Sequence, residues 1–163
     1  MPFLRVAIVS LSFVIVGSAL AHDASSHAPK SKKPTSTAEK AFGRAGDPKK
    51  ATRTIKVDAS DTMRFTPHEL HVKHGETIRF EVRNSGQTMH EMVLGTMQDL
   101  KAHAEHMRKV SSMDHHDEPY IAHVAPGKTE RLVWQFTKTG DFYYGCLIPG
   151  HFEAGMIGKI FVR

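Results

Sequence analysis

Cysteine is almost absent from this 163-residue chain, which contains only Cys146. One cysteine cannot form a disulfide bond within its own chain, so the sequence excludes a scaffold held together by disulfides. Three roles remain for Cys146: an intermolecular disulfide, a free thiol or a metal ligand. The choice between them depends on the residues around it.

Long hydrophobic runs are missing beyond residue 21, so we expect no stable membrane insertion of the mature protein. The one apolar run, residues 6–16, follows Arg5 and leads to Ala19 and Ala21. A charged start, an apolar middle and small residues at positions −3 and −1 are typical of a cleavable signal peptide. The run is also short for a membrane anchor. We therefore predict that residues 1–21 are a signal peptide and that the protein is exported.

A surplus of charge is missing from most of the chain, although the net charge is +5. Residues 22–52 carry seven Lys and Arg against three acidic residues, whereas residues 53–163 carry fourteen residues of each sign. The basic character belongs to one segment, which argues against a nucleic-acid partner. Because residues 22–52 also contain almost no large apolar residues, we expect a flexible leader there and one domain over residues 53–163.

Within that domain, short stretches alternate apolar and polar residues, as half-buried strands do. Strands are expected near residues 55–57, 70–72, 78–82, 87–94, 120–124, 129–136, 142–146 and 156–162. One helix is expected near residues 96–110, because apolar residues recur there at helical spacing. Many short strands with one inserted helix predict an all-β fold, a Greek-key β-sandwich.

Side chains of the kinds that bind copper lie close together near the end of the chain. Cys146, His151 and Met156 follow one another with the spacing Cys-x4-His-x4-Met. Cu(I) prefers sulfur and Cu(II) accepts imidazole, so two histidines, one thiolate and a weak thioether serve both oxidation states. The loop is one histidine short, and His90, in the strand expected over residues 87–94, is the candidate for the missing ligand. Either sulfur alone fits a buried apolar role, but the combination favours copper, since zinc would require a third histidine or a second cysteine.

Residues 143–151, with the sequence Tyr-Tyr-Gly-Cys-Leu-Ile-Pro-Gly-His, resemble the copper loop of the cupredoxin family, and within it most closely that of rusticyanin. The resemblance is specific from residue 141 to residue 162 and extends over residues 54–163 by strand pattern. It implies a β-sandwich that holds one type 1 copper ion with the four residues named above. One residue departs from the family pattern: Glu91 stands where many cupredoxins have Asn or Ser, whose side chain helps to tie the two ligand-bearing segments together.

The residues around His151 are mostly apolar, at positions 147–149 and 152. An apolar rim suits the brief docking of another redox protein, so a transient redox partner is expected near His151. An oxidase with a trinuclear copper centre is disfavoured, because such enzymes place histidines on both sides of the cysteine and this chain has Gly145 and Leu147 there. The only reaction that remains a candidate is the oxidation of Cu(I).

Methionine and histidine are concentrated between residues 89 and 116, and both are ligands of exported proteins that meet Cu(I). They predict a second copper site among Met89, His103, His106, Met107, Met113, His115 and His116. The alternative is that these histidines are only solvated and that Met107 belongs to the apolar face of the helix. If the signal peptide is removed after residue 21, His22 becomes N-terminal. Its amine and imidazole, with His27 nearby, then form a third candidate copper site.

A type 1 copper loop, a segment rich in methionine and histidine, and a leader that carries histidine together resemble the periplasmic cupredoxins associated with copper tolerance. The resemblance implies a periplasmic protein that protects its compartment by binding copper ions, with oxidation of Cu(I) through the type 1 centre. The alternative is a mobile one-electron carrier between respiratory or photosynthetic partners.

Overall fold

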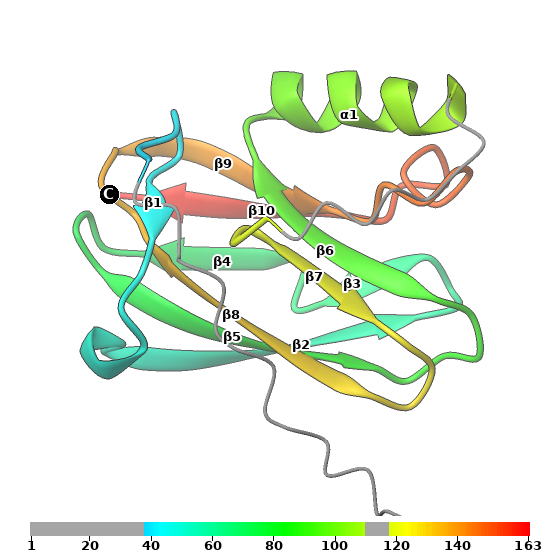
Figure 1. Cartoon of the computed structure of the whole chain (residues 1–163), viewed down its shortest axis with the longest axis horizontal. Coiled ribbons are helices and arrows are strands. Elements are labelled where there is room, and N and C mark those ends of the chain that lie inside the picture. Colours follow the sequence, from blue (N-terminus) through cyan, green and yellow to red (C-terminus); the bar gives the residue numbers. More distant parts are fainter. Residues whose placement is uncertain (1–37, 110–117) are drawn as a thin grey trace, which may run out of the picture. The chain divides into compact units, whose positions relative to one another are not determined.

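The computed structural model describes residues 38–109 and 118–163, and these form two β-sheets that pack face to face (Figure 1). The first sheet contains, in spatial order, β1 (Arg44–Ala45), β8 (Thr129–Gln135), β5 (Thr77–Asn84), β2 (Arg53–Ser60) and β3 (Arg64–Thr66). The second contains β4 (Glu69–Val72), β10 (Ile157–Val162), β9 (Gly140–Gly145), β6 (His90–Gly95) and β7 (Ile121–Val124). Parallel pairing joins β2 to β5 and β4 to β10. The predicted all-β sandwich is confirmed, and β1 and β3 are the strands that the sequence pattern does not predict.

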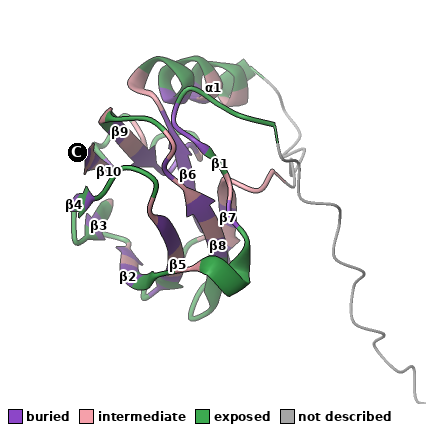
Figure 2. Ribbon diagram, turned by 90° about the vertical axis from the view of Figure 1, so that its left-hand side faces the viewer, coloured by how far each residue is buried: buried purple, intermediate pink, exposed green. Residues whose placement is uncertain are grey.

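The strand β5 shows how the sequence builds these sheets. Its residues Ile78, Phe80 and Val82 are fully buried between the sheets, and the residues that alternate with them face outward. On the outward face Glu81 forms an ion pair with Arg131 of the neighbouring β8, with an N–O distance of 2.9 Å. This alternation is what a strand with one buried face requires. Figure 2 shows the buried residues concentrated on the strands and the exposed ones on the turns and along much of the helix.

The strand β6 differs from β5, because all six of its residues are buried. Met92 and Leu94 face the core between the sheets, whereas Val93 faces outward and packs against helix α1 (Met97–Lys109). Figure 1 shows the helix lying across this outer face of the second sheet. His90, the first residue of β6, lies on the same face as Met92 and Leu94 and has no exposed surface.

The helix α1 agrees with the helix that the sequence predicts, and a capping box at its start explains where it begins. The Thr96 hydroxyl accepts a hydrogen bond from the Asp99 N–H at 3.1 Å, and the Asp99 carboxylate accepts one from the Thr96 N–H at 3.2 Å. Leu100 and Ala104 are buried against the second sheet. Met97 and Met107, the two methionines on the predicted apolar face of this helix, are only half-buried.

The structure differs from the sequence prediction at the start of the domain, where a flexible leader is predicted through residue 52. Residues 40–50 pack on the sandwich and include β1 and a short 3-10 helix, η1 (Pro48–Lys50). Phe42 is only 4% exposed, and its ring stacks on Trp134 with centroids 5.0 Å apart. The Phe42 carbonyl also accepts a hydrogen bond from the Trp134 indole N–H at 2.9 Å. This aromatic anchor and the pairing of β1 with β8 hold a segment that contains no other large apolar residue.

The predicted signal peptide over residues 1–21 and the part of the predicted leader up to residue 37 lie outside the described residues. Both stay predictions. In the part of the chain that the structure describes, no helix has the length and apolar character needed to cross a membrane.

Candidate metal centre

Three residues from two segments of the chain meet at the β9–β10 loop. His90 opens β6, Cys146 directly follows β9, and His151 lies in the loop itself. One ligand atom from each of the three lies within 4.8 Å of the other two. The Cys146 sulfur is 3.3 Å from His151 Nδ1, and the imidazole centroids of His90 and His151 are 5.1 Å apart. The structure thus brings together three of the four copper ligands that the sequence predicts.

Met156, the fourth predicted ligand, closes the same loop. It is fully buried, its N–H donates to the His151 carbonyl at 3.1 Å, and its carbonyl accepts a hydrogen bond from the Cys146 N–H at 3.1 Å. Gly150 and Gly155 have φ angles of 91° and 88°, in the left-handed region that favours glycine, and they allow the loop to turn twice. The backbone therefore joins Met156 to both other loop residues, while a bond from its sulfur to copper stays a prediction.

The electrostatic environment of the loop ligands fits a soft metal cation. Cys146 has no exposed surface, and burial raises the pKa of its thiol to about 12, so a thiolate there needs a positive charge beside it. Burial, together with the nearby His90, lowers the pKa of His151, and a neutral imidazole is the form that binds a metal. One thiolate with two imidazoles matches the donor set of type 1 copper.

His90 offers one ring nitrogen to this centre. Its side chain is completely buried, and its Nδ1 has no hydrogen-bond partner among the described residues. The other ring nitrogen, Nε2, lies 3.0 Å from Asp61 Oδ1. Because buried polar atoms are almost always paired, an unpaired Nδ1 beside a thiol and a second imidazole indicates a metal ligand. The residues present therefore fit copper.

Glu91 links the two ligand-bearing segments. Its Oε1 accepts a hydrogen bond from the Leu147 N–H at 2.9 Å, and its own N–H donates to the Cys146 sulfur at 3.5 Å. Its Oε2 lies 3.1 Å from Nδ1 of His123 in β7. Glu91 therefore supplies the connection that Asn or Ser was expected to supply at this position, but with a carboxylate. The sequence carries no signal for His123, because the pairing of β6 with β7, and not spacing along the chain, brings it to Glu91.

The turn between β2 and β3 contacts both ligand-bearing segments, which the sequence does not predict either. Asp61 accepts hydrogen bonds from the Thr88 hydroxyl at 2.8 Å and from His90 Nε2 at 3.0 Å. Arg64, the first residue of β3 after this turn, donates through Nη1 to the Ala154 carbonyl in the β9–β10 loop at 2.8 Å. No local motif marks this turn, since Asp61 precedes His90 by 29 residues.

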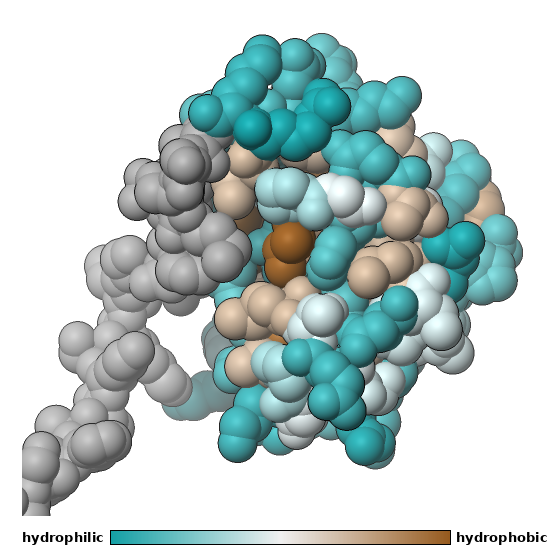
Figure 3. Space-filling model, turned by 90° about the vertical axis from the view of Figure 1, so that its right-hand side faces the viewer, coloured by the Kyte–Doolittle hydropathy of each residue, from teal (hydrophilic) through white to brown (hydrophobic). Residues whose placement is uncertain are grey.

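The surface around the candidate centre is apolar. His151 is half-exposed; in the same loop Pro149 is exposed, and Ile148 and Phe152 are half-buried. Figure 3, which views the molecule from the side of the β9–β10 loop in Figure 1, shows apolar residues surrounded by hydrophilic ones. This is the setting that the sequence predicts for a docking surface near His151.

The predicted second copper site is only partly described. Its described members are the half-buried Met89, His103 and Met107 and the exposed His106. Its other members and both histidines of the predicted N-terminal site lie outside the described residues: Met113, His115, His116, His22 and His27. Among the described histidine, cysteine and acidic side chains, the group at His90, Cys146 and His151 is the one set of three that could hold a metal ion. Both additional sites stay predictions.

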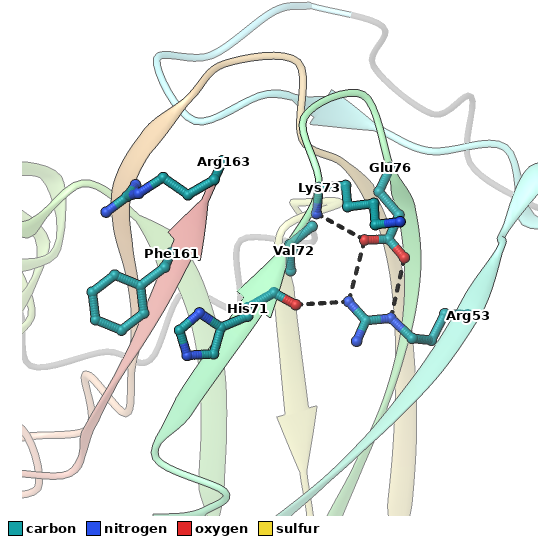
Figure 4. Close-up of a pocket in the computed structure, with 7 residues that line it drawn as sticks. All are labelled: Arg53, His71, Val72, Lys73, Glu76, Phe161 and Arg163. Atoms are coloured by element: carbon teal, nitrogen blue, oxygen red, sulfur yellow. Dashed lines mark hydrogen bonds and ion pairs between the residues drawn. The ribbon is translucent and has the colours of Figure 1, made fainter.

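A separate hollow lies at the far end of β10 from the β9–β10 loop (Figure 4). The Arg53 guanidinium there lies between the Glu76 carboxylate, at 3.1 Å, and the His71 carbonyl, at 2.8 Å. At its edge Arg163 binds the Asp141 carboxylate at 2.6 Å. Because both arginines are engaged by carboxylates of the same chain, we assign no ligand to this hollow.

Comparison with known proteins identifies the family. The chain matches the copper binding proteins of the plastocyanin/azurin family over residues 51–163. It belongs to this family. The copper-resistant cuproprotein CopI of Rubrivivax gelatinosus is 54% identical to this cupredoxin over 126 residues, which cover 77% of this chain and 76% of the relative. The protein of the same name from Pseudomonas aeruginosa is 36% identical over 154 residues, which cover 76% of this chain and 83% of the relative.

Solved structures show the same fold. Auracyanin B has a TM-score of 0.63 and 21% identity, covering 75% of this chain and 96% of its own. Reduced auracyanin from the photosynthetic bacterium Roseiflexus castenholzii has a TM-score of 0.60 and 20% identity, covering 69% of this chain and 98% of its own. The predicted cupredoxin family and its copper are thus confirmed, while the particular likeness of the copper loop to rusticyanin stays a prediction.

Proposed function

We propose that this cupredoxin holds one type 1 copper ion with His90, Cys146 and His151, with Met156 as the fourth ligand, and that it serves copper tolerance in the periplasm. The observation that carries the proposal is the convergence of one imidazole from β6 with one thiol and one imidazole from the β9–β10 loop, beside a His90 Nδ1 that has no hydrogen-bond partner among the described residues. Two relatives that carry the name copper-resistant cuproprotein support the biological role.

The fold suits a centre that exchanges electrons without rearranging. When bound, copper supplies reversible one-electron exchange between Cu(I) and Cu(II). Glu91 holds the His90 segment to Leu147, and backbone hydrogen bonds of Met156 close the loop around His151. Because these contacts do not involve the metal, they hold the ligand atoms in place in both oxidation states. Few atoms then have to move when an electron is gained or lost.

Oxidation of Cu(I) is the reaction that fits copper tolerance. A Cu(I) ion of the periplasm would be the substrate and would lose one electron to become Cu(II). His90, Cys146 and His151 would hold the type 1 copper, which would supply the one-electron acceptor, and a redox partner would remove the electron. His151 is the exit for the electron, since its ring is half-exposed within an apolar rim. Brief docking of a transient partner suits a small apolar surface of this kind.

Helix α1 places potential Cu(I) ligands near the same loop. Its residue Arg108 forms an ion pair with Glu153 of the β9–β10 loop at 3.6 Å. His103 and Met107, four residues apart on this helix, are imidazole and thioether ligands of the kinds that bind Cu(I). We expect them to contribute to the capture of Cu(I).

Substitution of the cysteine tests the centre. Cys146→Ser should abolish the intense visible band of thiolate-to-copper charge transfer, whereas His68→Ala, which removes an exposed histidine, should leave it unchanged. A band that persists in Cys146→Ser, or that never develops in the wild-type protein loaded with Cu(II), would show that the assignment is wrong.

The alternative function is a mobile electron carrier, which the apolar rim around His151 also favours. Copper stoichiometry and growth separate the two. A single copper that is unchanged in His103→Ala/Met107→Ala, with normal growth of a deletion strain on excess copper and impaired respiration, would favour the carrier. Additional Cu(I) bound by the wild-type protein and lost in the double variant, with copper-sensitive growth of the deletion strain, would favour copper tolerance.

A further inference from the structure

Asp61 binds the ring nitrogen of His90 that is not offered to the copper centre. The His90 side chain has no exposed surface, and its Nε2 lies 3.0 Å from Asp61 Oδ1. A neutral imidazole carries one proton, and an Nε2–H that donates to a carboxylate leaves Nδ1 with the lone pair. That is the atom with no hydrogen-bond partner among the described residues. The contact therefore selects the tautomer that can bind a metal through Nδ1.

Asp61 is itself held firmly in this position. Its Oδ2 accepts a hydrogen bond from the Gln87 N–H at 2.7 Å, and its Oδ1 accepts one from the Thr88 hydroxyl at 2.8 Å. Glycine at position 86 lets the Asp61 carboxylate lie close to the backbone of residues 86–88, since a Cβ at position 86 would lie 2.1 Å from Asp61 Oδ1. The carboxylate thus accepts hydrogen bonds from a backbone N–H, a hydroxyl and an imidazole, and these partners favour its charged form.

The charge of Asp61 lies one imidazole ring away from the metal-binding atom. A carboxylate that accepts the second N–H of a ligating histidine increases the electron density on the ring and makes it a stronger ligand. A fixed negative charge nearby also stabilises the more positive of two oxidation states. Both effects favour Cu(II) over Cu(I) at the centre.

We propose that Asp61 is a positioning residue for His90, which selects its Nε2–H tautomer and lowers the reduction potential of the type 1 centre. The effect on the potential rests on the proposed function, whereas the effect on the tautomer concerns the metal-free protein. The two parts therefore have separate tests.

The tautomer of His90 is measured by 15N NMR of the metal-free protein. In the wild-type protein Nε2 should carry the proton and Nδ1 should not. In Asp61→Ala the signals should shift toward a mixture of both tautomers. Asp58→Ala is the matched control, because Asp58 lies in the preceding strand and binds the Ser85 hydroxyl at 2.6 Å instead of a histidine. An unchanged Nε2–H tautomer in Asp61→Ala would overturn the proposal.

The potential is measured on copper-loaded protein with Asp61→Asn, which removes the charge and keeps an oxygen that can accept the hydrogen bond from His90. Its reduction potential should rise above that of the wild type, and Asp61→Glu should return it toward the wild-type value. Asp58→Asn removes the same charge without touching His90 and should change the potential much less. Equal potentials for the two Asn variants would overturn the role of Asp61 while the copper centre stands. A wild-type protein with no charge-transfer band would instead overturn the centre, and the NMR test would still decide the role of Asp61.

Discussion

The Glu91 carboxylate accepts a hydrogen bond from the Leu147 N–H at 2.9 Å. Glu91 directly follows the proposed copper ligand His90, and Leu147 directly follows the proposed ligand Cys146, so this bond joins the two ligand-bearing segments. The two residues are 56 positions apart in sequence, and both are buried. A buried N–H that loses its acceptor costs more than the net free energy of one hydrogen bond, because water cannot replace the partner. Glu91 therefore helps to hold His90 and Cys146 at the separation that one metal ion needs.

Removal of this link should weaken copper binding. We expect Glu91→Ala to lower copper affinity by about 10–100-fold, the range typical of groups that support metal ligands. Glu91→Gln should lose less, because its amide oxygen can still accept the hydrogen bond from Leu147. The copper affinity of both variants is measured by competition with a chelator, with the charge-transfer band as the readout. Glu130→Ala on β8 removes an exposed carboxylate as a control, and a Glu91→Ala protein that binds copper as tightly as this control would contradict the prediction.

The small core beneath helix α1 should stabilise the fold next to the copper loop. Leu100 is 1% exposed and belongs to a small cluster with Val93 and Leu147. We expect Leu100→Ala to lower the free energy of unfolding by about 2–4 kcal/mol, because it leaves a cavity under the ligand loop. Denaturant titration of the metal-free protein measures the loss. Lys101→Ala on the exposed side of the helix should stay within about 0.5 kcal/mol of the wild type, and equal stabilities for the two variants would show that the cluster does not support the fold.

A close contact between β9 and β10 predicts a second packing effect. A Cβ on Gly158 would lie 2.0 Å from Cζ of Tyr144, which is fully buried and donates its hydroxyl to the Pro67 carbonyl. The ring has little room to move, so Gly158→Ala should destabilise the protein by about 1–3 kcal/mol. Thermal and denaturant unfolding measure the change. The loss of unfolding free energy caused by Gly158→Ala should be smaller in a Tyr144→Leu background. An equal loss in that background would show that contact with the Tyr144 ring is not its cause.

Most of the copper site could be predicted from the sequence because copper limits the residue types and one loop holds most of the ligands. Cys146, His151 and Met156 lie within eleven consecutive residues, 146–156, so their spacing alone brings them together. His90 could be predicted because only a second imidazole was missing. The supporting residues could not. Asp61 and His123 reach the site through turns and strand pairing that no spacing along the chain reveals.

The fold shows the same division between local pattern and long-range contact. Strands such as β5 alternate apolar and polar residues, and that pattern is visible in the sequence. The start of the domain is not visible in this way, because a segment with one large apolar residue, Phe42, is held by the contact of that residue with Trp134 and by the pairing of β1 with β8. Average composition describes the solvated residues of this segment well. It gives too little weight to the single ring of Phe42, which packs on Trp134 far away in the sequence.

Acid should weaken the metal-free fold partly through Asp141. The carboxylate of Asp141 binds Lys159 Nζ at 2.8 Å and Arg163 Nη2 at 2.6 Å, and these two partners hold its pKa below the usual range. The folded state then binds this proton less tightly than the unfolded state does. The resulting stabilisation is present above the unfolded pKa, about 3.9, and is lost as the pH falls through the lower pKa of the folded protein. Denaturant titrations from neutral pH down to about pH 3 should therefore show a smaller loss of stability in Asp141→Asn than in the wild type. Lys159→Met removes the partner instead of the acid and should reduce the same pH dependence, whereas parallel curves for all three proteins would contradict this role of Asp141.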